Sequence, residues 1–304
     1  MNARQILEGR FPAERLLFGA DMARYTTFRV GGPAEALLFP ANEEEILSAL
    51  TLCRDHDIPV FVMGKGSNLL IRDGGMDGLV IRLDDSFSGI TAEGDTLHAL
   101  AGSSLAQLSC AALAAGLTGL EFASGIPGSV GGGMAMNAGA YGGELSQFTV
   151  GCRVLHPKTL CVSYLDKDAL EMGYRTTRAL REGYIILSAD LRLTPGDKAG
   201  IKALMDDLGR RRREKQPLTY PSAGSTFKRP EGHFAGALIE GAGLKGMAVG
   251  GACVSEKHAG FIVNTGSATA KDILDLIALV QKRVLEKDGV LLEPEVRILG
   301  KDPA

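Results

Sequence analysis

The segment from Gly125 to Glu144, GIPGSVGGGMAMNAGAYGGE, restricts the possible folds of this chain more than any other segment. Eight of the nineteen residues 125–143 are glycine, and no charged side chain occurs among them. Glycine loses more backbone freedom on folding than any other residue, so such a density needs a structural reason. Apolar residues such as Ile126, Val130 and Met134 argue against a flexible linker, because linkers are polar. We therefore expect a buried loop whose free backbone amides bind a cofactor.

The composition is that of an ordinary soluble globular protein: 304 residues, of which 45% are hydrophobic and 23% charged. A net charge of −3 at pH 7 offers no general attraction for nucleic acid or anionic membranes, so we expect neither partner. The chain contains no apolar run of the roughly 18 residues that a membrane span needs. The five cysteines are odd in number and form no C-x-x-C pair, which is typical of reduced thiols in a cytoplasmic protein.

Hydrophobic periodicity predicts a mixture of helices and strands. Asn42 and Glu45 have the spacing of a capping box at the start of one helix, and Thr269 and Asp272 begin the last helix in the same way. Further helices are expected at 103–115, 198–214 and 236–244. The expected strands are 36–39, 59–63, 79–83, 89–93, 97–101, 148–155, 160–165, 184–193, 261–263 and 290–299. Pro195-Gly196-Asp197 is typical of a domain boundary.

A second glycine loop, Gly64-Lys-Gly-Ser-Asn-Leu-Leu, follows the apolar strand 59–63. It is neither a Walker loop nor a G-x-G-x-x-G fingerprint, because Leu69 stands where the third glycine belongs. A strand that runs into such a turn can point successive amides at a pyrophosphate, although a plain turn has the same pattern. Two glycine loops attached to apolar structure favour a dinucleotide shared between two lobes.

Two sets of charged residues have both a purely structural and a functional interpretation. Arg175 follows Gly173-Tyr174 between two strands. It is either a solvated turn residue or a guanidinium that binds a carboxylate through two parallel hydrogen bonds. Local sequence alone favours the first. The run Arg210–Arg213 with Lys215 ends a predicted helix, where cations favour the helix dipole. A phosphate-binding patch is the alternative.

The familiar catalytic patterns are missing. Neither G-x-S-x-G nor H-E-x-x-H occurs, and the five histidines show no ligand spacing, so neither a hydrolase nor a metal site is expected. Two cofactor loops favour an enzyme in which a bound cofactor performs the difficult step while the protein orients substrate and supplies a proton.

Several of these segments resemble the UDP-N-acetylenolpyruvoylglucosamine reductase family over residues 20–300, in the same order. The FAD-binding signatures are similar to Tyr25-Thr-Thr-Phe-Arg-Val-Gly-Gly, Gly64-Lys-Gly-Ser-Asn-Leu-Leu, Gly125-Ile-Pro-Gly-Ser-Val-Gly-Gly and Asn137-Ala-Gly-Ala-Tyr-Gly-Gly-Glu. The substrate half resembles Tyr174-Arg175, Ser222-Ala-Gly-Ser-Thr-Phe-Lys228, Gly243-Leu-Lys-Gly246 and Leu292-Glu-Pro-Glu-Val-Arg297.

The resemblance implies an α+β fold with a two-lobed FAD-binding domain of the vanillyl-alcohol oxidase type and a C-terminal α+β substrate-binding domain. The expected lobes are 1–85, 86–196 and 197–304. It also implies a monomer or weak oligomer that uses FAD and NADPH to make UDP-N-acetylmuramate for peptidoglycan. Only Glu231-Gly-His-Phe234 separates the motif around Ser225 from the helix expected at 236–244. The shorter form of the family, type II, is therefore expected.

Site residues follow from the resemblance, position by position. The catalytic residues would be Ser225 as proton donor, with Arg175 and Glu295 beside the enolpyruvyl group. The substrate-binding residues would be Tyr174, Lys215, Lys228, Arg229, Lys245, His258 and Arg297. The FAD-binding residues would be Gly64, Lys65, Gly66, Ser67, Asn68, Leu69, Gly125, Ile126, Pro127, Gly128, Ser129, Gly132, Asn137 and Gly139.

The implied chemistry is hydride addition from flavin N5 to C3 of the enol ether, followed by protonation of C2 by Ser225. Arg229 departs from the asparagine that the family often has after the motif lysine, which affects the nucleotide contacts rather than the proton donor. Two other functions compete with this one. The first is a flavin-dependent oxidase of small alcohols on the same scaffold, and the second is a non-catalytic UDP-sugar-binding protein.

Overall fold

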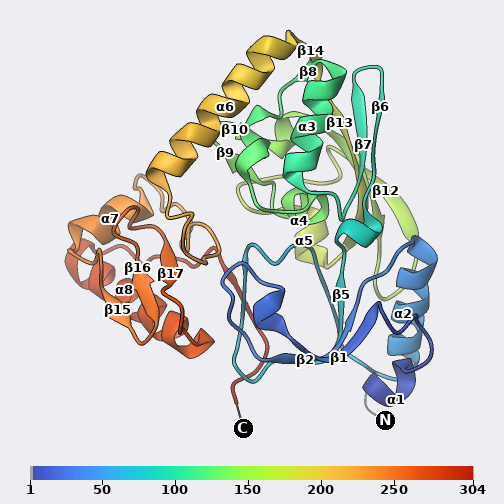
Figure 1. Cartoon of the computed structure of the whole chain (residues 1–304), viewed down its shortest axis with the longest axis horizontal. Coiled ribbons are helices and arrows are strands. Elements are labelled where there is room, and N and C mark those ends of the chain that lie inside the picture. Colours follow the sequence, from blue (N-terminus) through green and yellow to red (C-terminus); the bar gives the residue numbers. More distant parts are fainter. Residues whose placement is uncertain (1–2, 304) are drawn as a thin grey trace. The chain divides into compact units, whose positions relative to one another are not determined.

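The structure is a computed structural model that describes residues 3–303, and the chain divides into two compact units (Figure 1). Unit 1 comprises the chain up to Phe18 together with Ala36–Lys65 and Gly78–Arg212. Unit 2 comprises Gly19–Glu35, Gly66–Asp77 and the chain from Arg213 onward. Both contain helices and strands, as expected for an α+β protein. The three predicted lobes with boundaries after residues 85 and 196 stay a prediction.

A five-stranded antiparallel sheet with the order β12-β11-β13-β7-β6 forms the centre of the larger part of unit 1. Helices α3 and α4 pack on one face and bury, among others, Leu105 and Val130 against Cys152 and Leu191. On β7 and β13, His98 Nδ1 lies 2.8 Å from Asp190 Oδ1. The strands are β6 (Ile90–Glu93), β7 (Thr96–Leu100), β11 (Thr149–Leu155), β12 (Val162–Asp166) and β13 (Ile185–Arg192).

Another sheet has the order β1-β2-β5-β3, in which β3 runs parallel to β5. Helices α1 and α2 cover the unit 1 residues of this sheet and bury Leu7, Ile46 and Leu50 in a second core. The strands are β1 (Leu16–Asp21), β2 (Pro33–Leu38), β3 (Val60–Met63) and β5 (Met76–Arg82), and the helices are α1 (Ala3–Leu7) and α2 (Glu43–Asp55).

The predicted cap of α2 is only half of a capping box. Asn42 accepts from the Glu45 amide at 2.9 Å, as the sequence indicates. The Glu45 carboxylate, however, accepts from Ala41 and from Arg15 instead of from the Asn42 amide. Helix α3 (Leu105–Ala115) has a complete capping box between Ser104 and Gln107.

Unit 2 contains a three-stranded antiparallel sheet of β15 (Ala248–Val249), β16 (Ala252–Val254) and β17 (Ile262–Asn264). Helix α8 (Ala270–Asp288) packs its apolar stripe into the core of this unit. The stripe consists of Ala270, Ile273, Leu276, Ile277, Val280 and Val284. Asp73 accepts from the Ala270 amide at 2.8 Å, which fixes the start of α8 beside β4 (Leu69–Ile71).

The predicted strand 290–299 is wrong for most of its length. Only Arg297–Leu299 (β18) forms a strand, and it pairs in parallel with β4. Pro294 has no amide hydrogen and makes a single bridge to Phe227, so a continuous ladder cannot form. Glu293 and Glu295 therefore flank that bridge and lie outside the regular strand.

The other elements are short except for α6. In unit 1 they are η2 (Asp85–Phe87), β8 (Leu117–Thr118), η3 (Glu121–Gly125), α4 (Val130–Ala135), β9 (Gly139–Ala140), β10 (Gly143–Glu144), η4 (Leu145–Gln147), α5 (Arg178–Glu182) and β14 (Thr194–Pro195). In unit 2 they are η1 (Met22–Arg24) and α7 (Ala235–Gly241). Helix α6 spans Lys198–Lys215.

Candidate functional site

Hydrogen bonds and short secondary-structure elements order the glycine-rich segment 125–144 in the structure. It leaves η3, forms a bridge between Ser129 and Ser104, and continues into α4. The Ser129 hydroxyl accepts from the Gly132 amide at 3.3 Å. The amides of Gly128 and Ser129 donate to no acceptor within residues 3–303, although both residues are buried. Buried amides without a partner are rare, so they indicate a ligand.

The two glycine loops meet at Gly64 and Ser129 in unit 1. A Cβ placed on Gly64 would overlap the Ser129 hydroxyl oxygen. Only glycine therefore lets the end of β3 come so close to the start of α4. The Lys65 amide next to it also lacks an acceptor in the described chain. This arrangement has the free amides and close backbone approach that a diphosphate requires, so these residues fit FAD.

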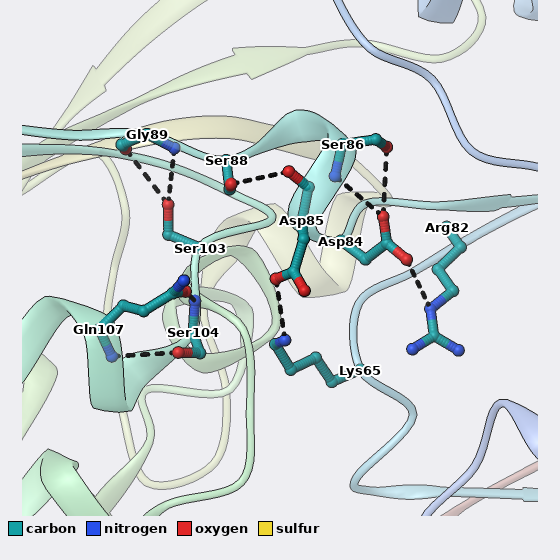
Figure 2. Close-up of polar contacts among 10 residues, drawn as sticks. All are labelled: Lys65, Arg82, Asp84, Asp85, Ser86, Ser88, Gly89, Ser103, Ser104 and Gln107. Carbon is teal, nitrogen blue, oxygen red and sulfur yellow. Dashed lines mark hydrogen bonds and ion pairs between the residues drawn. The ribbon is translucent and has the colours of Figure 1, made fainter.

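A network of polar side chains fixes the turn beside Lys65 (Figure 2). The Lys65 ammonium lies 3.2 Å from the Asp85 carboxylate. Asp84 accepts from the Ser86 amide at 3.2 Å and pairs with Arg82 at 3.4 Å. This turn approaches the start of α3, where the Ser103 hydroxyl accepts from the Gly89 amide at 3.0 Å.

The centre of the loop reaches the Tyr174–Arg175 turn through Asn137. The buried Asn137 side chain donates to the Gly173 carbonyl at 3.1 Å and accepts from the Ser146 amide at 2.9 Å. Arg175 donates from Nη2 to the Gly139 carbonyl at 3.3 Å. The sequence separately indicated the two segments, and unit 1 brings them together.

Unit 2 contains the rest of the second glycine loop. Gly66 accepts from the Thr27 amide at 3.2 Å, and the Asn68 side chain donates to the Glu295 carbonyl at 3.0 Å. The Asn68 carbonyl accepts from Arg297 at 3.0 Å, and Leu69 then enters β4 opposite Arg297. Residues 228 positions apart in the sequence thus become neighbours.

The predicted proton donor and carboxylate lie on adjoining backbone segments of unit 2. The Glu295 amide donates to the Thr226 carbonyl at 2.8 Å, and the Lys228 amide donates to the Glu293 carbonyl at 2.8 Å. Thr226 is buried, whereas Ser225 before it is exposed. These bonds bring the main chain of Glu295 next to Thr226, the residue that follows Ser225.

Three predicted substrate-binding cations of unit 2, Lys228, Arg229 and Lys245, have side-chain partners within that unit. Lys228 pairs with Glu293, and Lys245 pairs with Glu240 at 2.7 Å. The Arg229 guanidinium lies 3.9 Å from the centre of the Phe234 ring, which is 61% exposed. Nothing in the sequence singled out Phe234, and only its neighbouring glycine and histidine mark a turn.

Other predicted residues occupy varied positions. His258 accepts from the Gly260 amide at 3.1 Å, and burial, with a further contribution from Lys245, lowers the pKa of its imidazole. Lys215 is exposed at the end of α6. Tyr174 is exposed in unit 1, where the Arg175 guanidinium lies 4.9 Å from the centre of its ring. In the central loop, Ile126 packs on the core, whereas Pro127 is exposed.

Sequence reasoning also missed Thr27. Its hydroxyl oxygen is buried and makes no hydrogen bond within the described residues, while its amide holds Gly66. The residue lies in the quoted Tyr25–Gly32 signature, so the signal was present, but no role was assigned to it. An orphaned hydroxyl beside a glycine loop also fits a bound ligand.

Among residues 3–303, no three His, Cys, Asp or Glu side chains gather as they would to hold a metal ion. No helix described there has the length and apolar character needed to cross a membrane.

Comparisons with known proteins give consistent results. Residues 216–299 match the family described as UDP-N-acetylenolpyruvoylglucosamine reductase, C-terminal domain, and residues 33–162 match the FAD binding domain. A UDP-N-acetylenolpyruvoylglucosamine reductase of Clostridium perfringens is 50% identical, covering 95% of this chain and 94% of the relative. One from Alkaliphilus oremlandii is 47% identical over 99% of each chain.

Solved structures agree. The reductase from Thermus caldophilus has a TM-score of 0.79 and 37% identity, over 93% of this chain and 97% of that chain. A Phl p 4 variant, a glucose oxidase, has a TM-score of 0.50 and 15% identity over 65% of this chain and 45% of that chain. The second likeness concerns the fold alone.

Proposed function

This chain belongs to the UDP-N-acetylenolpyruvoylglucosamine reductase family, and on that premise we propose that it reduces UDP-N-acetyl-enolpyruvoylglucosamine to UDP-N-acetylmuramate with NADPH. The reaction belongs to peptidoglycan precursor synthesis. FAD, when bound, accepts hydride from NADPH and supplies it to the vinyl ether of the substrate. The amides of Lys65, Gly128 and Ser129 in unit 1, which have no acceptor in the described chain, would hold its diphosphate.

Arg175 binds the substrate carboxylate in this proposal. Hydride addition to the vinyl ether moves negative charge toward that carboxylate, and a fixed guanidinium stabilises the charge where it develops. The bond to the Gly139 carbonyl and the contact with the Tyr174 ring orient the guanidinium in advance. Glu295, in unit 2, is the second catalytic residue that we assign to this step.

Ser225 delivers the proton to C2. A serine hydroxyl is a weak acid in water, so it needs a fixed position and neighbouring groups that assist its ionisation. The bond from the Glu295 amide to Thr226 fixes the turn that carries Ser225. Lys228, three residues further on, supplies positive charge at the same turn.

The nucleotide sugar binds through Tyr174, Lys215, Lys228, Arg229, Lys245, His258 and Arg297. Because Lys228 and Lys245 pair with Glu293 and Glu240, a diphosphate would compete with these carboxylates. We place the enzyme in the cytoplasm as a monomer or weak oligomer, since its five cysteines are free and its proposed substrates are nucleotides. The lobe boundaries after residues 85 and 196 belong to the same proposal.

One observation carries the proposal above the rest. In unit 2 the Asn68 side chain of a predicted FAD loop binds the main chain of Glu295, whose amide in turn binds the residue after Ser225. A cofactor loop, a carboxylate and a hydroxyl that are far apart in the sequence thus form one continuous structure. An oxidase of small alcohols requires no such serine–carboxylate edge.

The test is an anaerobic titration of the NADPH-reduced protein with the enolpyruvyl nucleotide sugar. We expect the yellow absorbance of oxidised flavin to return with one equivalent of substrate. Purified protein without flavin would contradict the proposal. Rapid oxygen consumption with small alcohols, and no response to the nucleotide sugar, would favour the oxidase instead.

A further inference from the structure

The arginine run at the end of α6 contains one residue that differs from its neighbours. Arg210 and Arg211 both pair with Asp207, at 2.6 and 2.7 Å, and more than half of each side chain is exposed. Arg212 is half-buried, and its side chain makes no hydrogen bond or ion pair with any residue between 3 and 303. The arginines of this run therefore differ in their surroundings: Arg210 and Arg211 are solvated, whereas Arg212 is partly buried.

Arg212 lies on the buried stripe of α6. Ile201 is buried, Leu208 packs on the core of unit 1, and Arg212 follows Leu208 by one helical turn. Its side chain extends over Gly125, where a Cβ would lie 3.0 Å from Arg212 Cδ and 3.4 Å from Nη1. Glycine at position 125 leaves the space that the guanidinium occupies.

A partly desolvated cation without a counter-ion is unfavourable unless a ligand supplies the missing charge. Burial lowers the pKa of Arg212, and Tyr141 is the group that opposes this effect. A tyrosine phenol is not a counter-ion at neutral pH. The Arg212 guanidinium thus lies beside the central loop without an ion pair to any carboxylate that the structure describes.

The position of Arg212 along the central loop indicates which anion would pair with its guanidinium. The free amides of Gly128 and Ser129 are the part suited to a diphosphate. Arg212 lies instead against Gly125 and near Tyr141, and Tyr141 is two residues from Gly139, the contact of Arg175. This part of the loop contacts Arg175, to which the proposed function assigns the carboxylate of the reacting group.

We propose that Arg212 is the counter-ion for the negative charge that the flavin ring acquires on reduction. The inference rests on the proposed FAD-dependent function. Arg212 binds both redox states but interacts more strongly with the anionic reduced ring, so it raises the midpoint potential of the bound flavin. It would thereby favour reduction by NADPH without contacting the substrate.

The experiment measures the midpoint potential of FAD in the full chain by equilibration with a reference dye. The variants are Arg212→Met, Arg212→Gln and Arg212→Lys, with Arg211→Met as the matched control from the same run. The dissociation constant of oxidised FAD is measured in parallel by adding FAD to the deflavinated protein. Neither readout depends on turnover.

We expect Arg212→Met and Arg212→Gln to reduce the preference for reduced over oxidised FAD at least about tenfold, a fall of about 30 mV for a two-electron couple. Arg212→Lys keeps the charge and should shift the potential less. Arg211→Met should leave the potential unchanged.

An unchanged potential in Arg212→Met overturns the inference, even if both redox states bind more weakly by one factor, because that pattern indicates a phosphate contact. Should Arg212→Met fail to fold or to hold FAD, an unchanged potential in Arg212→Gln has the same meaning. If the wild-type protein binds no FAD, both this inference and the proposed function are wrong. If the wild-type protein binds FAD and the Arg212 variants have the wild-type potential, only this inference is wrong.

Discussion

The side-chain amide of Asn68 donates to the main-chain carbonyl of Glu295 at 3.0 Å, and this bond joins a glycine loop to the segment before β18 that carries the predicted catalytic carboxylate. The bond is partly buried, so its loss should affect both stability and position.

Asn68→Ala is expected to cost about 1 kcal/mol of unfolding free energy and to lower kcat at least about tenfold. Urea unfolding and steady-state turnover measure the two effects. Gln281→Ala is the matched control, because Gln281 also donates from a side-chain amide to a main-chain carbonyl, that of Leu292 at 2.8 Å. Equal losses of kcat in the two variants would mean that the Asn68 bond has only a structural role.

Ser225→Ala should leave flavin reduction by NADPH intact and slow reoxidation by substrate by roughly three decades or more. The hydroxyl donates a proton only in the second half-reaction, so stopped-flow absorbance of each half-reaction separates the effects. Ser267→Ala, an exposed serine elsewhere in unit 2, should change neither rate. Reoxidation at the wild-type rate in Ser225→Ala would remove Ser225 from the mechanism.

Arg175→Lys should lower kcat/KM about a hundredfold while FAD binding stays normal. A lysine ammonium cannot grip a carboxylate with two parallel bonds, and it also loses the planar contact with the Tyr174 ring. Arg181→Lys is the control, because Arg181 is an exposed residue of α5 that pairs with Glu171. Turnover in Arg175→Lys that matches the control would exclude Arg175 from the site.

Gly64→Ala should weaken FAD binding at least about tenfold and destabilise the protein by about 1–3 kcal/mol. The new methyl group displaces the Ser129 hydroxyl, which caps α4 at Gly132. Fluorescence titration with FAD and thermal unfolding measure these changes. In Gly200→Ala the nearest neighbour of the methyl group is Asp197 at 3.5 Å, so that variant should bind FAD normally. Normal FAD affinity in Gly64→Ala would show that the two loops have room to separate.

Unfolding free energy should fall between about pH 9 and pH 12. Burial, assisted by Asp190, raises the pKa of the Cys152 thiol to about 12, and burial raises that of Cys53 to about 11. The unfolded thiols ionise first, so their contribution to stability is complete below pH 9 and is lost as pH rises through the folded values. Each thiol contributes a slope of about 1.4 kcal/mol per pH unit. Denaturant titrations of Cys152→Ala should show a shallower slope, whereas Cys110→Ala, at an exposed position, should match wild type.

Sequence patterns predicted elements whose determinants are local. The cap at Ser104 and the stop at Gly116 define α3, and Thr269 with Gly289 defines α8, because each terminus depends on bonds within one turn. The strand expected over 290–299 was wrong because its pairing depends on Phe227 and Asn68, which are far away in the sequence. Pairing of that kind has no local signature.

The same distinction applies to the site. The glycine density of the central loop indicated close backbone approach, and Gly64 against Ser129 is such an approach. Local sequence favoured a solvated turn for Arg175, and only the family resemblance pointed to the site. Its neighbour Gly139 and the Asn137 bond to Gly173 are tertiary contacts. Helical spacing pairs Arg210 and Arg211 with Asp207, three and four residues earlier, but the position of Arg212 over Gly125 is a tertiary contact that the run itself does not indicate.

The parallel pairing of β4 with β18 has a consequence for biosynthesis. Residues 69–71 leave the ribosome more than two hundred residues before their partners 297–299, so the nascent chain lacks that neighbour until translation is nearly complete. Asn68 likewise cannot form its hydrogen bonds with Arg297 and Glu295 until those residues have been synthesised. The loop proposed to bind FAD therefore gains these contacts late in synthesis, and we expect chains that end before β18 to be isolated without flavin.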